Sequence, residues 1–119
     1  MRIAVCIKRT PDSEVKVRLS ADGLSLDPSG VGFDLGPYDE IAVEEALRIR
    51  DAAGGPPGAE VVVLCAGPAE AATQIRKAMA MGADRGILIK GEFPFSDAAS
   101  VGAALAGVLK ELSCDLCLT

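Results

Sequence analysis

Four short apolar runs along the chain predict the buried strands of a sheet. They lie at Ile3–Ile7, Val61–Cys65, Ile87–Ile89 and Asp115–Leu118. Each run is too short for a helix, and an unbroken apolar run of this length is typical of a parallel strand that is buried on both faces. We therefore expect four parallel strands in one sheet.

Helical periodicity fills the intervals between these runs. The first helix is predicted to open at the turn Gly36-Pro37-Tyr38-Asp39, with Asp39 as its N-cap. Acidic residues gather towards its start and arginines towards its end, as the helix dipole favours. Its apolar face is expected to consist of Ala42, Val43, Ala46, Leu47 and Ile49.

Two further helices are expected nearer the carboxyl end. The second covers about Ala69–Met81 and has Gly82 at its C-terminal cap. The third begins at Ser96 or Asp97. The residues that we expect to face inward are Ala72, Ile75 and Met79 in the second helix and Val101, Leu105, Val108 and Leu112 in the third.

Between the first strand and the first helix, apolar and polar residues alternate. The alternation at residues 15–19 predicts a half-exposed strand, Ala21-Asp22-Gly23 supplies a turn, and Leu24 and Leu26 continue on the far side. Alternation resumes at residues 31–35. This stretch is predicted to be a small antiparallel hairpin excursion.

Strands that alternate with helices place the chain in the α/β class. We expect a three-layer arrangement, in which helices cover both faces of a parallel sheet and the crossovers are right-handed. The 119 residues provide enough chain for one domain, residues 1–119, and not for two.

The charge balance excludes several classes of partner. The net charge is −5 and the chain has no His. Nucleic-acid binding needs a basic face, and adsorption to anionic lipid needs basic clusters. No apolar run approaches the ~18 residues of a membrane span, and neither a signal peptide nor a transit peptide is recognisable. We expect a bacterial cytoplasmic protein that binds no nucleic acid and does not insert into membranes. His-based catalytic triads are excluded.

The four cysteines suggest a redox or metal site only at first sight. Cys6 and Cys65 fall within strand runs, where a free cysteine behaves as a small apolar residue. Cys114 and Cys117 have the CxxC spacing of metal and redox sites. Residues three apart on a strand point to opposite faces, however. We therefore expect all four thiols to be reduced and free of metal.

Candidate chemistry is concentrated at the carboxyl ends of the strands, where open parallel sheets bind ligands. The loops Cys6–Arg9 and Cys65–Pro68 and the helix start Gly36–Asp39 lie there. Plainer interpretations stay open, because Lys8 and Arg9 could be a solvated strand end and Gly67-Pro68 a tight turn. Neither Gly-rich phosphate fingerprint is present, and GxSxG is absent. The residues alone indicate an α/β nucleotide-type domain with an unspecified ligand.

Three segments in order resemble beta subunits of electron transfer flavoproteins. They are IAVCIKRTPDSEVKVRL (residues 3–19), GPYDEIAVEEALRIR (36–50) and AMAMGADRGILI (78–89). The resemblance implies an adenine-nucleotide-hydrolase-like fold with the first strand central. It also implies bound AMP, or a second FAD in electron-bifurcating members. The stretch from Tyr38 to Glu45 favours the AMP-binding kind.

The resemblance further implies the partners and the site. Such subunits form a heterodimer with an alpha subunit that holds the electron-transferring FAD, and they catalyse nothing alone. The heterodimer carries electrons from acyl-CoA and related dehydrogenases to a membrane quinone oxidoreductase. The nucleotide contacts of the family correspond to Cys6, Gly36, Pro37, Tyr38, Asp39 and Ala66. Family members usually have Asn where this chain has Gly36, so one amide side chain is lost here.

Family members are roughly twice as long as this chain. We therefore expect residues 1–119 to be incomplete at the C-terminal side, truncated after the fourth strand, with weak or no AMP binding and no flavin. Two other classes were compared. A universal-stress-type ATP-binding module has a similar strand pattern, and its phosphate loop would follow the fourth strand. ATP pyrophosphatases carry an SGGxxS-like loop after the first strand, which Lys8-Arg9-Thr10-Pro11 does not resemble.

Overall fold

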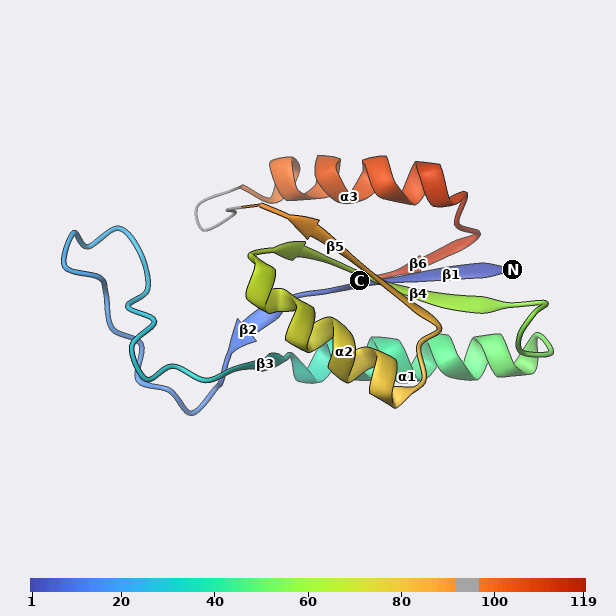
Figure 1. The fold of residues 1–119 in the computed structure, drawn as a ribbon, viewed down its shortest axis with the longest axis horizontal. Helices are drawn as coiled ribbons and strands as arrows, with labels where there is room; N and C mark the ends of the chain where they lie inside the picture. Colours follow the sequence, from blue (N-terminus) through green and yellow to red (C-terminus); the bar gives the residue numbers. More distant parts are fainter. Residues whose placement is uncertain (92–96) are drawn as a thin grey trace.

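A four-stranded parallel sheet forms the centre of the computed structural model, which describes residues 1–91 and 97–119. Its strand order is β5-β4-β1-β6 (Figure 1). The strands are β1 (Arg2–Ile7), β4 (Glu60–Gly67), β5 (Arg85–Lys90) and β6 (Leu116–Leu118). All three pairings are parallel, which confirms the predicted strands and the inner position of the first one.

The two inner strands are buried on both faces. Ile3, Ala4 and Val5 of β1 have no exposed surface, and neither has any residue from Val61 to Cys65 in β4. Unbroken runs of β-branched and aliphatic residues suit this position, since neither face of the strand meets water. The edge strands β5 and β6 are only partly buried, in keeping with their shorter apolar runs.

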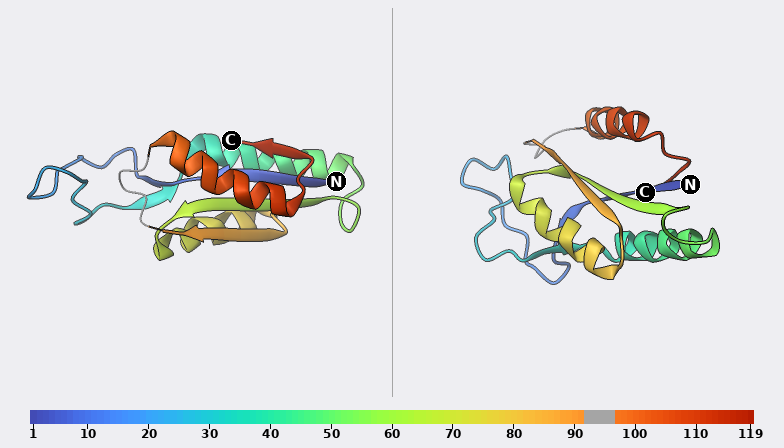
Figure 2. Two further views of the ribbon diagram at one scale, coloured as in Figure 1. Left: turned by 90° about the horizontal axis from the view of Figure 1, so that it is seen from above. Right: turned by 45° about the vertical axis from the view of Figure 1, so that its right-hand side comes forward.

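Helices cover both faces of the sheet, as expected for a three-layer α/β fold. Helices α1 (Pro37–Ala52) and α2 (Ala72–Met81) lie on one face, and α3 (Ala98–Leu112) lies on the other (Figures 1 and 2). A short 3-10 turn, η1 (Ala69–Ala71), precedes α2. The three predicted helices are therefore present in the described part of the chain.

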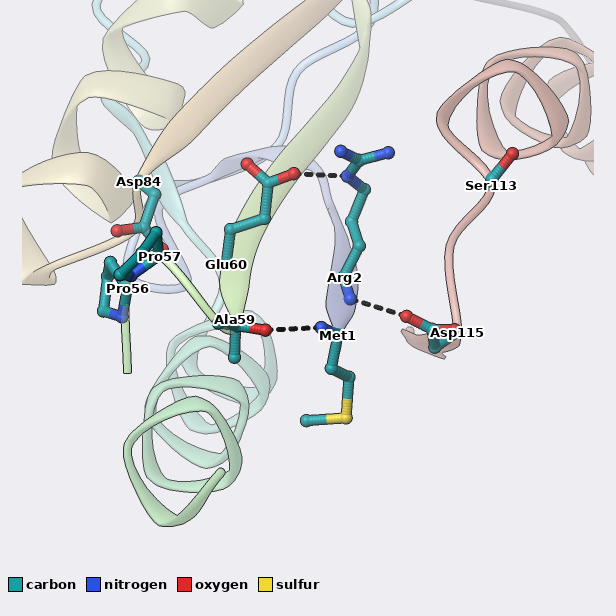
Figure 3. A pocket seen from close by; sticks show the side chains of 10 residues that line it. Met1, Arg2, Pro56, Pro57, Ala59, Glu60, Asp84, Ser113 and Asp115 are labelled. Atoms are coloured by element: carbon teal, nitrogen blue, oxygen red, sulfur yellow. Dashed lines mark hydrogen bonds and ion pairs between the residues drawn. The ribbon is translucent and has the colours of Figure 1, made fainter. Parts of the chain in front are cut away.

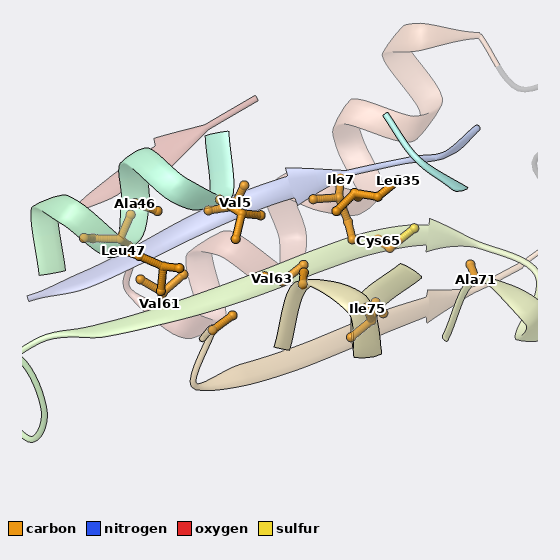
Figure 4. Close-up of a cluster of buried hydrophobic side chains, with 14 residues drawn as sticks. Val5, Ile7, Leu35, Ala46, Leu47, Val61, Val63, Cys65, Ala71 and Ile75 are labelled. Carbon is orange, nitrogen blue, oxygen red and sulfur yellow. The ribbon is translucent and has the colours of Figure 1, made fainter. Parts of the chain in front are cut away.

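The hydrophobic core lies between the sheet and the α1–α2 layer (Figure 4). From the sheet it takes alternate residues of β1 and β4, such as Val5 and Val63, and from the helices it takes residues such as Leu47 and Ile75. On the other face, α3 buries no residue completely, and its predicted stripe is only half-buried. The two helical layers thus contribute unequally to the core.

Several helix details differ from the sequence prediction. Gly36, and not Asp39, is the N-cap of α1, because Pro37 already occupies the first turn. In α2, Met79 is 41% exposed, while the buried residues are Gln74, Ile75 and Ala78. The predicted C-cap of α2 is confirmed, with Gly82 at φ 127°. The alternative caps of α3 were Ser96, which lies outside the described residues, and Asp97, whose carboxylate accepts the Ser100 N–H at 2.8 Å.

The antiparallel excursion exists, and its two named strands form a ribbon that was not predicted. Strands β2 (Arg9–Pro11) and β3 (Phe33–Leu35) pair with each other, and residues 15–19 form no strand. Across the predicted turn Leu19 and Leu26 form an antiparallel bridge. The Ser20 N–H donates to the Ser25 carbonyl at 2.8 Å and the Asp27 N–H to the Arg18 carbonyl at 2.9 Å, so the predicted hairpin is present in short form. The Arg9 guanidinium lies 3.4 Å from the centroid of the Phe33 ring, which stabilises this ribbon by a cation–π contact.

The excursion projects from the body of the molecule (Figure 1). The radius of gyration is 15.2 Å and the extents are 51 × 27 × 19 Å. A compact domain of this length would have a radius of gyration of about 13.5 Å. At its base, the Lys77 ammonium of α2 pairs with Asp34 at 2.9 Å and with Glu40 at 2.7 Å, which ties β3 and α1 to α2.

Candidate functional site

The strand order places the candidate site between β1 and β6. From β1 the chain adds β4 and then β5 on one side, and it returns to place β6 on the other side of β1. Ligands of open parallel sheets bind at the carboxyl ends of the strands where the order reverses in this way. The ends of β1 and β6 are therefore the first place to look for a ligand site.

Asp39 fixes the loop that leaves β1. Its carboxylate Oδ2 accepts the Lys8 backbone N–H at 2.9 Å, so the first turn of α1 holds the loop immediately after the strand. Gly36 stands beside this contact, because a Cβ at Gly36 would lie 3.5 Å from Asp39 Oδ2 and 3.7 Å from Thr10 Oγ1. The structure thus brings Gly36 and Asp39 to the end of β1. Thr10, which no sequence motif indicated, belongs to the same group.

The start of α1 keeps its first donors uncapped. Gly36 has no side chain, and no side-chain hydrogen bond caps the helix. The N–H groups of a helix start attract the polar and anionic groups of a ligand. This arrangement fits a nucleotide, because backbone donors and an acidic acceptor meet at one end of the sheet.

Two thiols meet at the same edge. Cys6 of β1 and Cys117 of β6 lie with their Sγ atoms 3.8 Å apart, and all four cysteines are unbonded. Burial raises the pKa of Cys6 to about 12, and the neighbouring Cys117 adds to this shift. Burial also raises the pKa of Cys65, which the backbone N–H of Arg9 partly opposes. Cys6 and Cys65 are therefore weak nucleophiles that stay protonated at neutral pH.

The remaining predicted site residues lie nearby with different exposure. Ala66 is half-buried near the end of β4, where it pairs with Ile89 of β5. Pro37 is exposed, and the Tyr38 side chain is 84% exposed. Ala66, Gly36 and Asp39 can therefore line a ligand site as the structure stands, whereas the Tyr38 ring is directed to solvent. Within residues 1–91 and 97–119, no group of three or more His, Cys, Asp or Glu side chains could hold a metal ion.

An open groove of about 660 Å³ adjoins these strand ends. It runs between residues 17–28 of the excursion, the ribbon of β2 and β3, and the exit of β4 at Ala66–Pro68. We call it the excursion groove. Its walls are mainly apolar, and its two charged lining residues are Lys8 and Arg9.

A second cavity, of about 560 Å³, lies at the opposite end of the sheet, where the strands begin (Figure 3). Its polar groups bind one another: the Met1 ammonium donates to the Gly58 carbonyl at 2.6 Å, and the Arg2 side chain pairs with Glu60. Asp84 accepts the Val61 N–H at 2.7 Å and pairs with Arg50 at 3.1 Å. These contacts hold the starts of the strands together, so this cavity is structural.

The comparisons with known proteins agree on one family. The family model described as Electron transfer flavoprotein domain matches residues 23–119. The chain belongs to the electron transfer flavoprotein family. The resemblance noted in its sequence is thereby confirmed, and the parallel α/β sheet agrees with it.

Two similar proteins carry the name of the beta subunit, and a third is named Protein FixA. The chain is 49% identical to Electron transfer flavoprotein subunit beta of Bradyrhizobium diazoefficiens over 92 residues, which are 77% of this chain and 36% of the relative. It is 39% identical to the human subunit beta over 114 residues, which are 95% of this chain and 43% of the relative. Protein FixA of Azorhizobium caulinodans is 39% identical over 113 residues, or 94% and 38%.

The chain spans less than half the length of these curated relatives. What a whole relative does therefore does not transfer directly to these 119 residues. Among the described residues, no helix is both long enough and apolar enough to cross a membrane.

Proposed function

We propose that the chain acts as a beta subunit of an electron transfer flavoprotein. It would support electron transfer from acyl-CoA and related dehydrogenases to a quinone oxidoreductase, as a heterodimer with a flavin-bearing alpha subunit. The observation that carries this proposal is the family match over residues 23–119 together with relatives that are named subunit beta. In this assembly FAD, held mainly by the alpha subunit, carries the electrons, and this chain has no catalytic step of its own.

We further propose that this chain supplies part of an AMP site at the carboxyl ends of its strands, and that residues 1–119 alone bind AMP only weakly. The residues that would hold it are Cys6, Gly36, Pro37, Tyr38, Asp39 and Ala66. Two features support this placement: the uncapped start of α1, and the Asp39–Lys8 contact that fixes the adjoining loop. The loop and the helix start would bind and orient the nucleotide, whose role here is structural.

The AMP site is tested by titration with two matched variants. Asp39→Ala removes the acceptor of the Lys8 N–H, and we expect it to weaken AMP binding about tenfold, as the loss of a hydrogen bond to a charged group would do. Glu44→Gln removes one negative charge from an exposed position of the same helix, and we expect no effect. NMR titration should shift the amides of residues 6–10, 36–40 and 66–68. Shifts confined to other segments, or equal affinity in Asp39→Ala, would contradict the site.

The electron-transfer role is tested by reconstitution. The chain and full-length Bradyrhizobium subunit beta would each be co-expressed with a flavin-bearing alpha subunit. Heterodimers would be identified by mass spectrometry, and reduction of the flavin by an acyl-CoA dehydrogenase and its substrate would be followed by absorbance. We expect the chain to bind the alpha subunit. If the full-length relative binds and the chain does not, residues 1–119 are insufficient for this partnership.

A further inference from the structure

Three of the exposed large apolar side chains among the described residues gather around the excursion groove. Val17, Leu19 and Leu24 are 71%, 68% and 68% exposed, and all three line it. Single exposed apolar residues are ordinary, but a cluster around one concave surface indicates a binding site. The opposite wall adds Phe33 and Pro68.

The charge of the groove is opposite to that of the chain. The chain carries a net charge of −5, yet the groove is lined by Lys8 and Arg9 and by no carboxylate. Neither side chain forms an ion pair with another residue of the described ranges. The groove therefore offers two uncompensated cations at the edge of an apolar surface.

Contacts of both its side chain and its backbone hold Arg9 in place at the groove. Its guanidinium lies over the Phe33 ring, with Cζ 3.4 Å from the centroid, and the pairing of β2 with β3 fixes its backbone opposite Leu35. A guanidinium stacked on a ring leaves its N–H groups free in the plane, where they can bind a carboxylate or a phosphate. Lys8 adjoins it and is exposed.

We propose that the excursion groove binds an anion with an apolar tail, in which the head group contacts Arg9 and Lys8 and the tail lies against Val17, Leu19 and Leu24. The volume of about 660 Å³ falls in the range of small-molecule sites. An apolar tail alone would account for the leucines, and a small anion alone would account for the cations. Both features in one groove select a molecule that has both. This site adjoins the proposed AMP site and shares Ala66 with it, but the proposal does not depend on AMP binding.

The test compares two ligands with the same tail and opposite charges, decanoate and decyltrimethylammonium. Each is titrated into the ¹⁵N-labelled chain below its micelle concentration, and backbone amide shifts are followed by NMR. We expect decanoate to shift residues 8–11, 17–28 and 66–68, and to bind about fivefold more tightly than the cation.

Variants separate the head group from the tail. Arg9→Gln should weaken decanoate about fivefold and leave decyltrimethylammonium unchanged, because only the anion contacts the guanidinium. Leu24→Ser should weaken both ligands, and its exposure means that folding is unaffected. Lys16→Gln is the matched control, because Lys16 is an exposed cation of the same excursion that does not line the groove, and we expect no change.

Three results would overturn the proposal. Equal affinity for the two ligands would show an apolar patch without preference for an anion. Shifts centred on residues 98–112 would place binding on α3 instead. An Arg9→Gln variant that retains a dispersed spectrum and full decanoate affinity would exclude the guanidinium as the head-group contact.

Discussion

Gly86 of β5 stands where no side chain fits, and replacing it tests how tightly α2 packs on the sheet. A Cβ at Gly86 would lie 2.1 Å from Ile75 Cγ2 and 3.2 Å from Met79 Sδ. Ile75 is buried and β-branched, so its Cγ2 cannot rotate away freely. We expect Gly86→Ala to lower the free energy of unfolding by about 1–3 kcal/mol, as overpacking does in other cores. That is a large part of the ~5–15 kcal/mol of an ordinary domain.

Urea unfolding of four variants would measure this effect and its cause. Gly107→Ala is the control, because a Cβ there meets nothing within 4 Å and the helix should gain about 0.5–1 kcal/mol. Ile75→Ala alone should cost about 2–5 kcal/mol through its cavity. In the Ile75→Ala background, Gly86→Ala should cost almost nothing, since the clashing methyl is gone. An equal penalty for Gly86→Ala in both backgrounds would refute the steric explanation.

Three other predictions concern single side chains. Gln74→Met removes the buried, unpartnered Oε1 of Gln74 but also the bond from its Nε2 to the Phe33 carbonyl at 3.2 Å, so the two effects oppose each other and we expect the free energy of unfolding in urea to change by less than about 1 kcal/mol. The Lys77 ammonium holds the pKa of Asp34 below its ordinary value of 3.8. The pair therefore stabilises the fold fully above pH 3.8 and loses this effect as the pH falls below the pKa of Asp34 in the folded state. The difference in the free energy of unfolding between wild type and Lys77→Met should shrink as the pH is lowered below 3.8. Because Cys6 is half-buried with a pKa raised to about 12, iodoacetamide at about pH 8 should label the exposed Cys117 first, as peptide mass spectrometry would show.

The elements predicted best from the sequence are those whose residues are all buried to a similar degree. Strands β1 and β4 are buried on both faces, so nearly every residue in them is apolar and the run itself marks the strand. The apolar face of α1 was also correct. In α2, which the 3-10 turn at Ala69–Ala71 precedes, Ile75 is buried as predicted, whereas Met79 is 41% exposed although its Sδ lies near Gly86 of β5. A continuous helix from Ala69 was assumed, and no residue marks the change.

The excursion was predicted only in part: its turn at residues 21–23 is present, but its two-stranded ribbon was missed. Alternation shows that a segment has two unlike faces, but it does not show which segment pairs with it. Residues 15–19 alternate well and form no strand, while Arg9–Pro11 shows no alternation and pairs with Phe33–Leu35. That ribbon joins residues more than twenty positions apart and depends on the Arg9–Phe33 contact, neither of which a local pattern contains.

Asp39 shows how far the candidate site could be inferred from residue types. An acidic residue near a helix start was correctly associated with the helix dipole, but the cap position was wrong. Pro37 starts the helix earlier, Asp39 falls within the first turn, and its carboxylate is directed to the Lys8 N–H of the neighbouring loop. Gly36 then leaves the helix donors uncapped. A ligand site needs both a fixed loop and free backbone N–H donors. Because the helix begins at Pro37, with Gly36 and not Asp39 as its N-cap, Asp39 can fix the loop while the first N–H groups of the helix stay uncapped. Sequence spacing could nominate these residues, but only the three-dimensional contact distinguishes a cap from a loop anchor.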